Sequence, residues 1–163
     1  MSTYITKQIP VSSHVKKYLE YNFGKSYTFS QNNFLGQIII NVFRKGYRKQ
    51  VVVKCDDSYT VKLKQYQIDV IGNLLEWEDC IVLNKAIDTF FRTQIFFHMD
   101  MNRKLDKDNS YPAMVQCLVE MNITESDIKY DTLYRDYKRK CVYPKTTKKK
   151  IDFEEEYVGM QSA

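Results

Sequence analysis

Apolar residues recur at helical spacing near the start of the chain. A helix is predicted within residues 11–25, because Val15, Tyr18 and Leu19 fall on one side of it. The hydroxyl of Ser12 or Ser13 is suited to capping the helix start. Gly24 follows the last apolar position and favours the left-handed backbone with which many helices end.

A second helix is predicted within residues 32–46, between an Asn-Asn pair that can cap its start and Gly46 at its end. Its buried side is expected to consist of Leu35, Ile38, Ile39, Val42 and Phe43. The apolar run over residues 38–40 also fits a buried strand, and the pattern alone leaves both alternatives open.

Two runs of alternating apolar and polar residues lie within residues 50–65, on either side of Asp56-Asp57-Ser58. This pattern predicts one β-hairpin with a polar turn. Three lysines lie on its polar face: Lys54, Lys62 and Lys64. They suit secondary contacts with phosphates, but exposed lysines also keep strand edges from pairing with other chains, and the second explanation carries more weight.

The longest predicted helix covers residues 76–104. Acidic residues lie at its start and Arg103 and Lys104 at its end, which suits the helix dipole. Apolar side chains cover most of its circumference, so it is expected to be central in the fold or to lie in a subunit interface. Association of identical chains through residues 81–97 is therefore predicted.

A helix-turn-helix-like pattern follows in residues 112–141. Asn122 tolerates a left-handed backbone, and the apolar Ile123 next to it is expected to fill the corner between two helices. Thr124 is placed to cap the next segment, with Asp127 three residues later in the position of a capping box.

Two geometries fit the last helix. In one, a continuous helix runs over residues 125–141. In the other, residues 126–128 form a short helix and Asp131 caps a separate helix over residues 132–141. The second geometry is slightly favoured, because Asp is a good cap directly before a helix.

The length of 163 residues suggests one domain. The fold class predicted is mainly α with one β-hairpin, over residues 1–141, followed by a flexible charged tail at residues 142–163. The net charge of +5 is unevenly distributed. Residues 128–150 contain nine basic residues and two acidic ones, whereas residues 151–163 contain four acidic residues and no basic one.

The concentration of positive charge points to nucleic acid as a partner. Arginine can bond to guanine in the major groove, and lysine and threonine can hold phosphates. The candidate nucleic-acid-binding residues are Lys129, Thr132, Arg135, Lys138, Arg139, Lys140, Lys148, Lys149 and Lys150.

Residues suited to catalysis do not form a recognisable motif. The four cysteines include no C-x-x-C pair, and both histidines are distant from them in sequence, so no metal site is expected. The chain has no glycine-rich phosphate loop and no nucleophile motif, so neither an enzyme nor a cofactor is expected. It also lacks a signal-like start and a membrane-length apolar run, which suggests the cytoplasm.

Three segments, "VSSHVKKYLEYNFG", "LGQIIINVFRK" and "NITESDIKYDTLYRDYKRK", resemble small proteins found in phages and mobile elements of gut anaerobes. The resemblance covers residues 11–141. Proteins of this group are usually described as hypothetical or DNA-binding. The resemblance implies that Asp131, Leu133 and Tyr137 form the scaffold of the last helix, with a basic face of Arg135, Lys138 and Arg139.

The function predicted is that of a small non-enzymatic DNA-binding protein of phage or mobile-element type, which contacts DNA through its basic C-terminal helix. The alternative is a structural or assembly protein, such as a virion or connector component, that oligomerises through its apolar helices. In that case the protein would be located in the virion.

Overall fold

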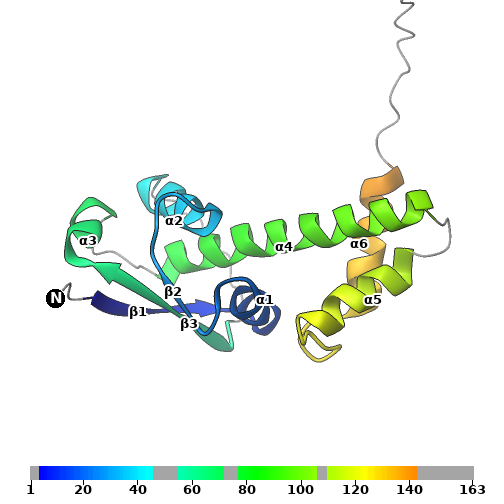
Figure 1. The fold of residues 1–163 in the computed structure, drawn as a ribbon, viewed down its shortest axis with the longest axis horizontal. Helices are drawn as coiled ribbons and strands as arrows, with labels where there is room; N and C mark the ends of the chain where they lie inside the picture. The colour runs from blue at the N-terminus through cyan, green and yellow to red at the C-terminus, as the bar shows by residue number, and fades with distance from the viewer. Residues whose placement is uncertain (1–3, 46–54, 72–76, 106–109, 143–163) are drawn as a thin grey trace, which may run out of the picture.

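Six helices and a three-stranded sheet form the described part of the computed structural model, residues 4–45, 55–71, 77–105 and 110–142 (Figure 1). The chain is mostly helical, as predicted. In order, the elements are β1 (Tyr4–Val11), α1 (Ser13–Phe23), β2 (Ser26–Thr28), α2 (Phe34–Lys45), β3 (Asp57–Lys64), α3 (Gln65–Ile71), α4 (Trp77–Leu105), α5 (Ser110–Glu120) and α6 (Tyr130–Val142).

The strand β3 is the centre of the sheet, which has the order β1-β3-β2. It is antiparallel to β1, with Val11 opposite Asp57, and parallel to β2, with Ser26 opposite Thr60. The predicted β-hairpin is therefore wrong, because Asp57 and Ser58 begin a strand instead of forming a turn. The alternation identified a strand but not its partners, which come from the start of the chain. The expected first strand of the hairpin, with Lys54, lies largely outside the described residues.

The alternation within β3 does define its two faces. Tyr59, Val61 and Leu63 are buried, whereas Lys62 and Lys64 on the other face are partly exposed. The hydroxyl of Tyr59 donates to the carbonyl of Gly24 at 2.8 Å, which attaches the end of α1 to the sheet.

The predicted first helix is confirmed as α1. The side-chain carbonyl of Asn84, a buried residue of α4, accepts a 2.9 Å hydrogen bond from the backbone N–H of Ser12. The distant Asn84 thus bonds to the backbone at the Ser12 N-cap, whose own hydroxyl makes no capping bond. Gly24 ends the helix with φ at +79°, in the region that favours glycine.

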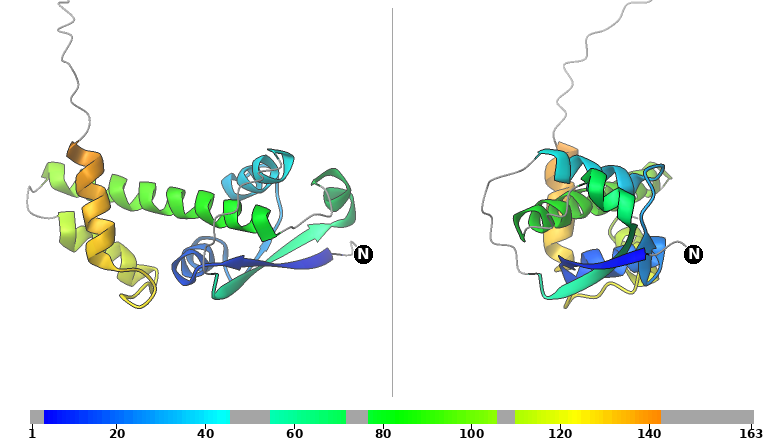
Figure 2. Two further views of the ribbon diagram at one scale, coloured as in Figure 1. Left: turned by 180° about the vertical axis from the view of Figure 1, so that it is seen from behind. Right: turned by 90° about the vertical axis from the view of Figure 1, so that its left-hand side faces the viewer.

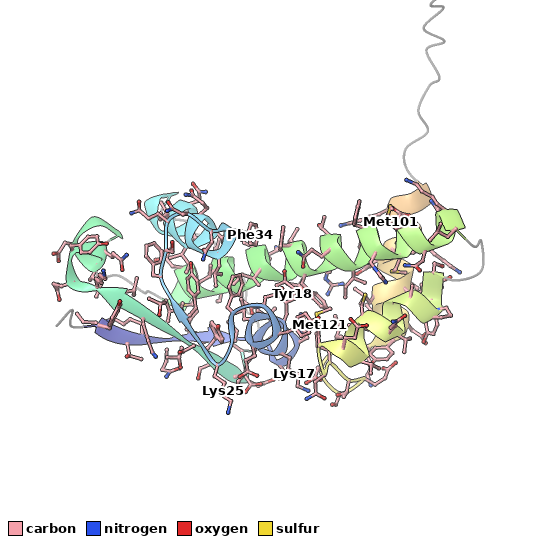
Figure 3. The ribbon with its side chains drawn as sticks, in the orientation of Figure 1. Lys17, Tyr18, Lys25, Phe34, Met101 and Met121 are labelled. Atoms are coloured by element: carbon pink, nitrogen blue, oxygen red, sulfur yellow. The ribbon has the colours of Figure 1, made fainter. Side chains whose placement is uncertain are left out.

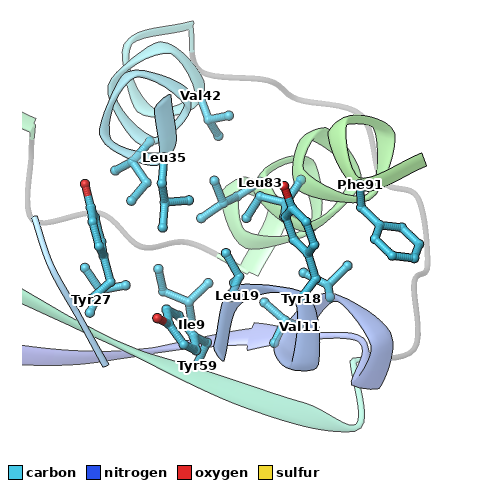
Figure 4. Close-up of a cluster of buried hydrophobic side chains, with 14 of the residues drawn as sticks. Ile9, Val11, Tyr18, Leu19, Tyr27, Leu35, Val42, Tyr59, Leu83 and Phe91 are labelled. Atoms are coloured by element: carbon cyan, nitrogen blue, oxygen red, sulfur yellow. The ribbon is translucent and has the colours of Figure 1, made fainter. Parts of the chain in front are cut away.

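The second segment is a helix, α2, and not the alternative strand. Asn33 caps it, since its Oδ1 accepts from the backbone N–H of Gly36 at 3.0 Å. The hydroxyl of Tyr27 donates to the same oxygen and also, at 3.1 Å, to the carbonyl of Ser30. Side chains of α1, α2, α4 and the sheet meet in one apolar cluster (Figure 4).

The 29-residue helix α4 connects the two ends of the molecule (Figures 1 and 2). Its first half packs against β1, α1 and α2, where Leu83 and Ile87 are buried. Its second half packs against α5 and, through Phe96 and Asp100, against Tyr137 of α6; Ile95 and Met99 are buried there. No helix in the described ranges combines the length and apolar character needed to cross a membrane.

Most of the apolar circumference of α4 is used inside the chain. Six apolar side chains of the segment predicted to associate are buried: Ile81, Leu83, Ile87, Phe91, Ile95 and Phe96. The large apolar side chains that α4 exposes lie later, at Phe97, Met101 and Leu105. Any surface that α4 offers to another molecule is therefore displaced toward its C-terminal end.

Candidate nucleic-acid interface

The predicted basic helix is α6, and it begins at Tyr130. The backbone carbonyl of Lys129 accepts from the N–H of Leu133 at 3.1 Å, so Lys129 is the residue before the first turn. A continuous helix from residue 125 is thus wrong, because residues 125–129 are not helical. The alternative with a separate helix is nearer, but residues 126–128 form no short helix, and Asp131 lies in the first turn of α6 and is not its cap.

The inward face of α6 attaches the helix to the rest of the protein. Leu133 and Tyr137 are buried, and the Tyr137 hydroxyl donates to Asp100 of α4 at 2.8 Å. The ring of Tyr134 meets the ring of Tyr111 on α5, with 5.1 Å between centroids. These contacts leave the remaining face of α6 open to solvent.

The outward face of α6 carries the predicted binding residues. Six of them are exposed: Lys129, Thr132, Arg135, Lys138, Arg139 and Lys140. Thr132, Arg135 and Arg139 follow one another at spacings of three and four, so they form one line along the helix. Lys148, Lys149 and Lys150 lie outside the described residues.

The five exposed Lys and Arg side chains of this set differ in their contacts within the protein. Arg139 forms an ion pair with Asp136 one turn earlier. Lys138 and Lys140 lie over aromatic rings, 4.6 Å from the centroid of Tyr134 and 5.0 Å from that of Phe96. Among the described residues, neither Arg135 nor Lys129 has an ion-pair partner.

A chain of ion pairs links α6 to the opposite half of the molecule. Arg92 of α4 donates to Asp136 at 2.8 Å and to Asp88 at 2.9 Å. Asp88 also lies 2.8 Å from Nε2 of His14 on α1. The chain holds Asp136 beneath the basic face, so its carboxylate partly compensates the charge of Arg139.

Acid is expected to weaken this chain. Burial alone would raise the pKa of Asp88, but hydrogen bonds from His14 and Arg92 outweigh it and hold that pKa below its usual value. A carboxyl group with a lowered pKa in the folded state stabilises the protein above the pKa of the unfolded chain, near pH 4. That stabilisation disappears as the pH falls through the folded-state pKa.

We therefore expect the free energy of unfolding, measured by urea titration, to fall between about pH 5 and pH 2, with a shallower fall in Asp88→Asn. Other carboxyl groups contribute to the slope of both proteins, so the difference between the two curves isolates Asp88. Equal slopes in the two proteins would contradict the expectation.

The turn before α6 matches the prediction at Asn122 and Ile123, but Thr124 caps no helix, because turns follow it. Asn122 has a φ of +54° and Ile123 is buried. Asp127 accepts from the backbone N–H of Thr124 at 2.7 Å and from Lys17 of α1 at 2.6 Å. The connection between α5 and α6 spans residues 121–129. That is longer than the three or four residues of an ordinary helix-turn-helix.

The predicted secondary contacts do not lie beside α6. Lys62 and Lys64 belong to β3, and the sheet and α6 lie at opposite ends of α4 (Figures 1 and 2). Lys64 lies 6.0 Å from the ring centroid of Tyr4 on the neighbouring strand. These lysines therefore do not extend the basic face of α6.

Residue types that can act in catalysis or metal binding lie in one open cleft but form no metal-binding cluster among the described residues. An open cleft of about 170 Å³ between α1, α4 and α5 is lined by Tyr21, Gln94, Ile95, His98, Cys117, Glu120 and Met121. Within the described ranges, no three His, Cys, Asp or Glu residues are grouped so that they could hold a metal ion.

Comparison with known proteins adds no relative. No family model, no curated protein and no solved structure matches this chain. The resemblance to phage and mobile-element proteins therefore stays a prediction.

Sequence reasoning missed the chain of ion pairs beneath the basic face. Asp88 and Arg92 are four residues apart on a helix, which is a spacing that indicates a pair. No comparable signal links Arg92 to Asp136 or Asp88 to His14, because those pairs depend on how three helices pack.

Proposed function

We propose that the protein binds DNA through the outward face of α6. The observation that carries the proposal is that Arg135 and Lys129 are exposed without an ion-pair partner among the described residues, on a helix whose other face is buried. Structural roles account for Leu133 and Tyr137 but not for Arg135. An arginine projecting from a firmly packed helix is suited to contact phosphates or guanine.

The charge along α6 suggests how it would lie on DNA. Asp131 near its start disfavours phosphates, whereas Arg135, Lys138 and Arg139 favour them toward its end. We infer that α6 and α5 act as a helix-turn-helix-like unit with a long connection. Phosphate contacts would then be concentrated in the second half of α6 and continue into the lysines at residues 145–150.

A double variant, Arg135→Ala with Arg139→Ala, tests the proposal. Fluorescence anisotropy with a random 30-base-pair duplex should show an affinity lowered about 10- to 100-fold at low salt. The slope of log K against log salt should become shallower by roughly 1.8, since each phosphate contact contributes about 0.9. Asp136 keeps its bond to Arg92 in this variant, so the fold is expected to persist, which circular dichroism can check.

The matched control removes two positive charges from the opposite end of the molecule, with Lys62→Ala and Lys64→Ala. It is expected to change the affinity less than threefold, since those lysines are remote from α6. Equal losses in both double variants would indicate a response to net charge alone and contradict a binding face on α6. Absence of binding by the unmodified protein at low salt would overturn DNA binding altogether.

A structural or assembly role is the second candidate, and a specific feature favours it. Phe97, Met101 and Leu105 expose 67%, 45% and 85% of their surface on one side of α4. Large apolar side chains grouped on a surface are typical of sites that contact another protein. If the unmodified protein forms large oligomers and shows no affinity for DNA, this role is favoured.

A further inference from the structure

The exposed apolar side of α4 continues beyond these three residues. Phe97, Met101 and Leu105 are spaced by four, and Phe90 lies two turns before Phe97, so all four project from the same side of the helix. The ring of Phe90 stacks on Phe34 of α2, with 3.6 Å between centroids, and Phe34 is itself 39% exposed. We name these five residues the α4 stripe; Phe34 and Met101 are labelled in Figure 3.

Between Phe90 and Met101 the surface around the stripe carries little charge, since Arg92 and Asp100 are only partly exposed, whereas Arg103 and Lys104 are exposed beside Leu105. Between Thr89 and Met101 the exposed residues of α4 are Thr89, Thr93, Gln94, Phe97, His98 and Met101, and none is a Lys, Arg, Asp or Glu. Depletion of charge around exposed aromatic and Met side chains is typical of the centre of a protein interface. An ordinary solvated helix face would carry charged residues at several of these positions.

Three polar groups along the stripe already have partners within the chain. The hydroxyl of Thr89 donates to the carbonyl of Lys85 at 2.9 Å, and that of Thr93 donates to the carbonyl of Thr89 at 2.8 Å. Oε1 of Gln94 accepts from the Tyr18 hydroxyl at 2.6 Å. Covering this face would therefore leave few hydrogen-bonding groups without a partner, which lowers the cost of burying it.

We propose that the α4 stripe binds a second copy of this chain, with the two α4 helices antiparallel and crossing at Phe97. The stripe is nearly symmetric about that residue, with the Phe34–Phe90 pair seven positions before it and Leu105 eight positions after it. A two-fold axis at Phe97 places Leu105 of each copy on the aromatic pair of the other. Such self-complementarity is what a two-fold interface requires.

Charge favours the antiparallel orientation. Arg103 and Lys104 are exposed at the end of α4, and a parallel pair would bring both basic ends together. An antiparallel pair separates them and also aligns the helix dipoles favourably. The exposed apolar area of the stripe is on the order of 400–500 Å², about half of what each partner buries in a standard interface. The dimer is thus expected to depend on concentration.

The proposal goes beyond DNA binding and does not rest on it. Sedimentation analysis over a range of concentrations should show a dimer for the unmodified protein and a monomer for Phe97→Glu. Val119→Glu on α5 is the matched control, because Val119 is exposed to the same extent, 67%. It should dimerise like the unmodified protein. A monomer at every soluble concentration of the unmodified protein, or equal effects of the two variants, would overturn the proposal.

Cysteine cross-linking tests the orientation. Under mild oxidation, Phe97→Cys should give a disulfide-linked dimer on a non-reducing gel. Leu105→Cys should not exceed the background of Val119→Cys, since the two copies of residue 105 would lie about 24 Å apart in an antiparallel pair. Efficient cross-linking through residue 105 would overturn the antiparallel arrangement.

Discussion

Phe91→Ala is expected to lower the free energy of unfolding by about 3–5 kcal/mol. Phe91 is fully buried in α4, and its ring lies 5.5 Å, between centroids, from both His14 and Tyr18 of α1. Truncation removes these contacts and leaves a cavity where α1 and α4 meet. Urea titration followed by circular dichroism measures the change.

The matched control is Phe97→Ala, which makes the same chemical change on the same helix at an exposed position. At a protein concentration low enough to keep both chains monomeric, it should change the free energy of unfolding by no more than about 0.5 kcal/mol. Equal losses of stability in the two variants would contradict the conclusion that Phe91 is buried in the core and Phe97 is exposed.

Gly36→Ala is expected to lower the free energy of unfolding by about 3 kcal/mol, at the upper end of what overpacking costs. A Cβ atom at position 36 would lie only 1.8 Å from the carbonyl oxygen of Ser30. That oxygen belongs to the backbone and accepts from the Tyr27 hydroxyl. Relief of the clash would therefore displace the turn before α2 and disturb the cap at Asn33.

Gly24→Ala provides the comparison for this variant. Gly24 has open space around its Cα atom but a φ of +79°, so alanine there meets backbone strain without a clash. Its expected cost is about 2 kcal/mol, because a φ of +79° with a ψ of −175° is a conformation that almost only glycine adopts. A Gly36→Ala variant as stable as the unmodified protein would show that the turn at Ser30 moves without cost, contrary to the expectation.

Local chemistry made much of the helical part predictable. Gly24 ends α1, Asn33 caps α2, and Asn122 takes the left-handed backbone, because each of these depends on a residue and its immediate neighbours. The sheet was harder to predict from the sequence. The strands β1 and β2 were not expected, and β3 was assigned to a hairpin. Pairing between Ile9 and Tyr59 depends on packing across a long stretch of chain, which alternation does not encode.

In the candidate site, too, the features set by local sequence were predictable and those set by packing between helices were not. Periodicity was enough to place Leu133 and Tyr137 inward and Arg135 outward, as the structure shows. It could not show that Asp136 would be held by Arg92. The apolar surface was expected in residues 81–97, but packing of α4 against four other helices and β1 left large apolar side chains exposed from the last residue of that range onward, at Phe97, Met101 and Leu105. Which side of an apolar helix is left uncovered depends on its neighbours.

The position of β3 between β1 and β2 has a consequence for synthesis on the ribosome. Val11 pairs with Asp57 and Tyr4 with Lys64, so β1 emerges long before its neighbour in the sheet exists. At roughly 5–20 residues per second, that delay amounts to several seconds. During this interval α1 and α2 have no sheet to pack against, and their apolar sides are open to chaperones. Completion of β3 closes a long loop in one step, a non-local event that slows folding relative to helix formation.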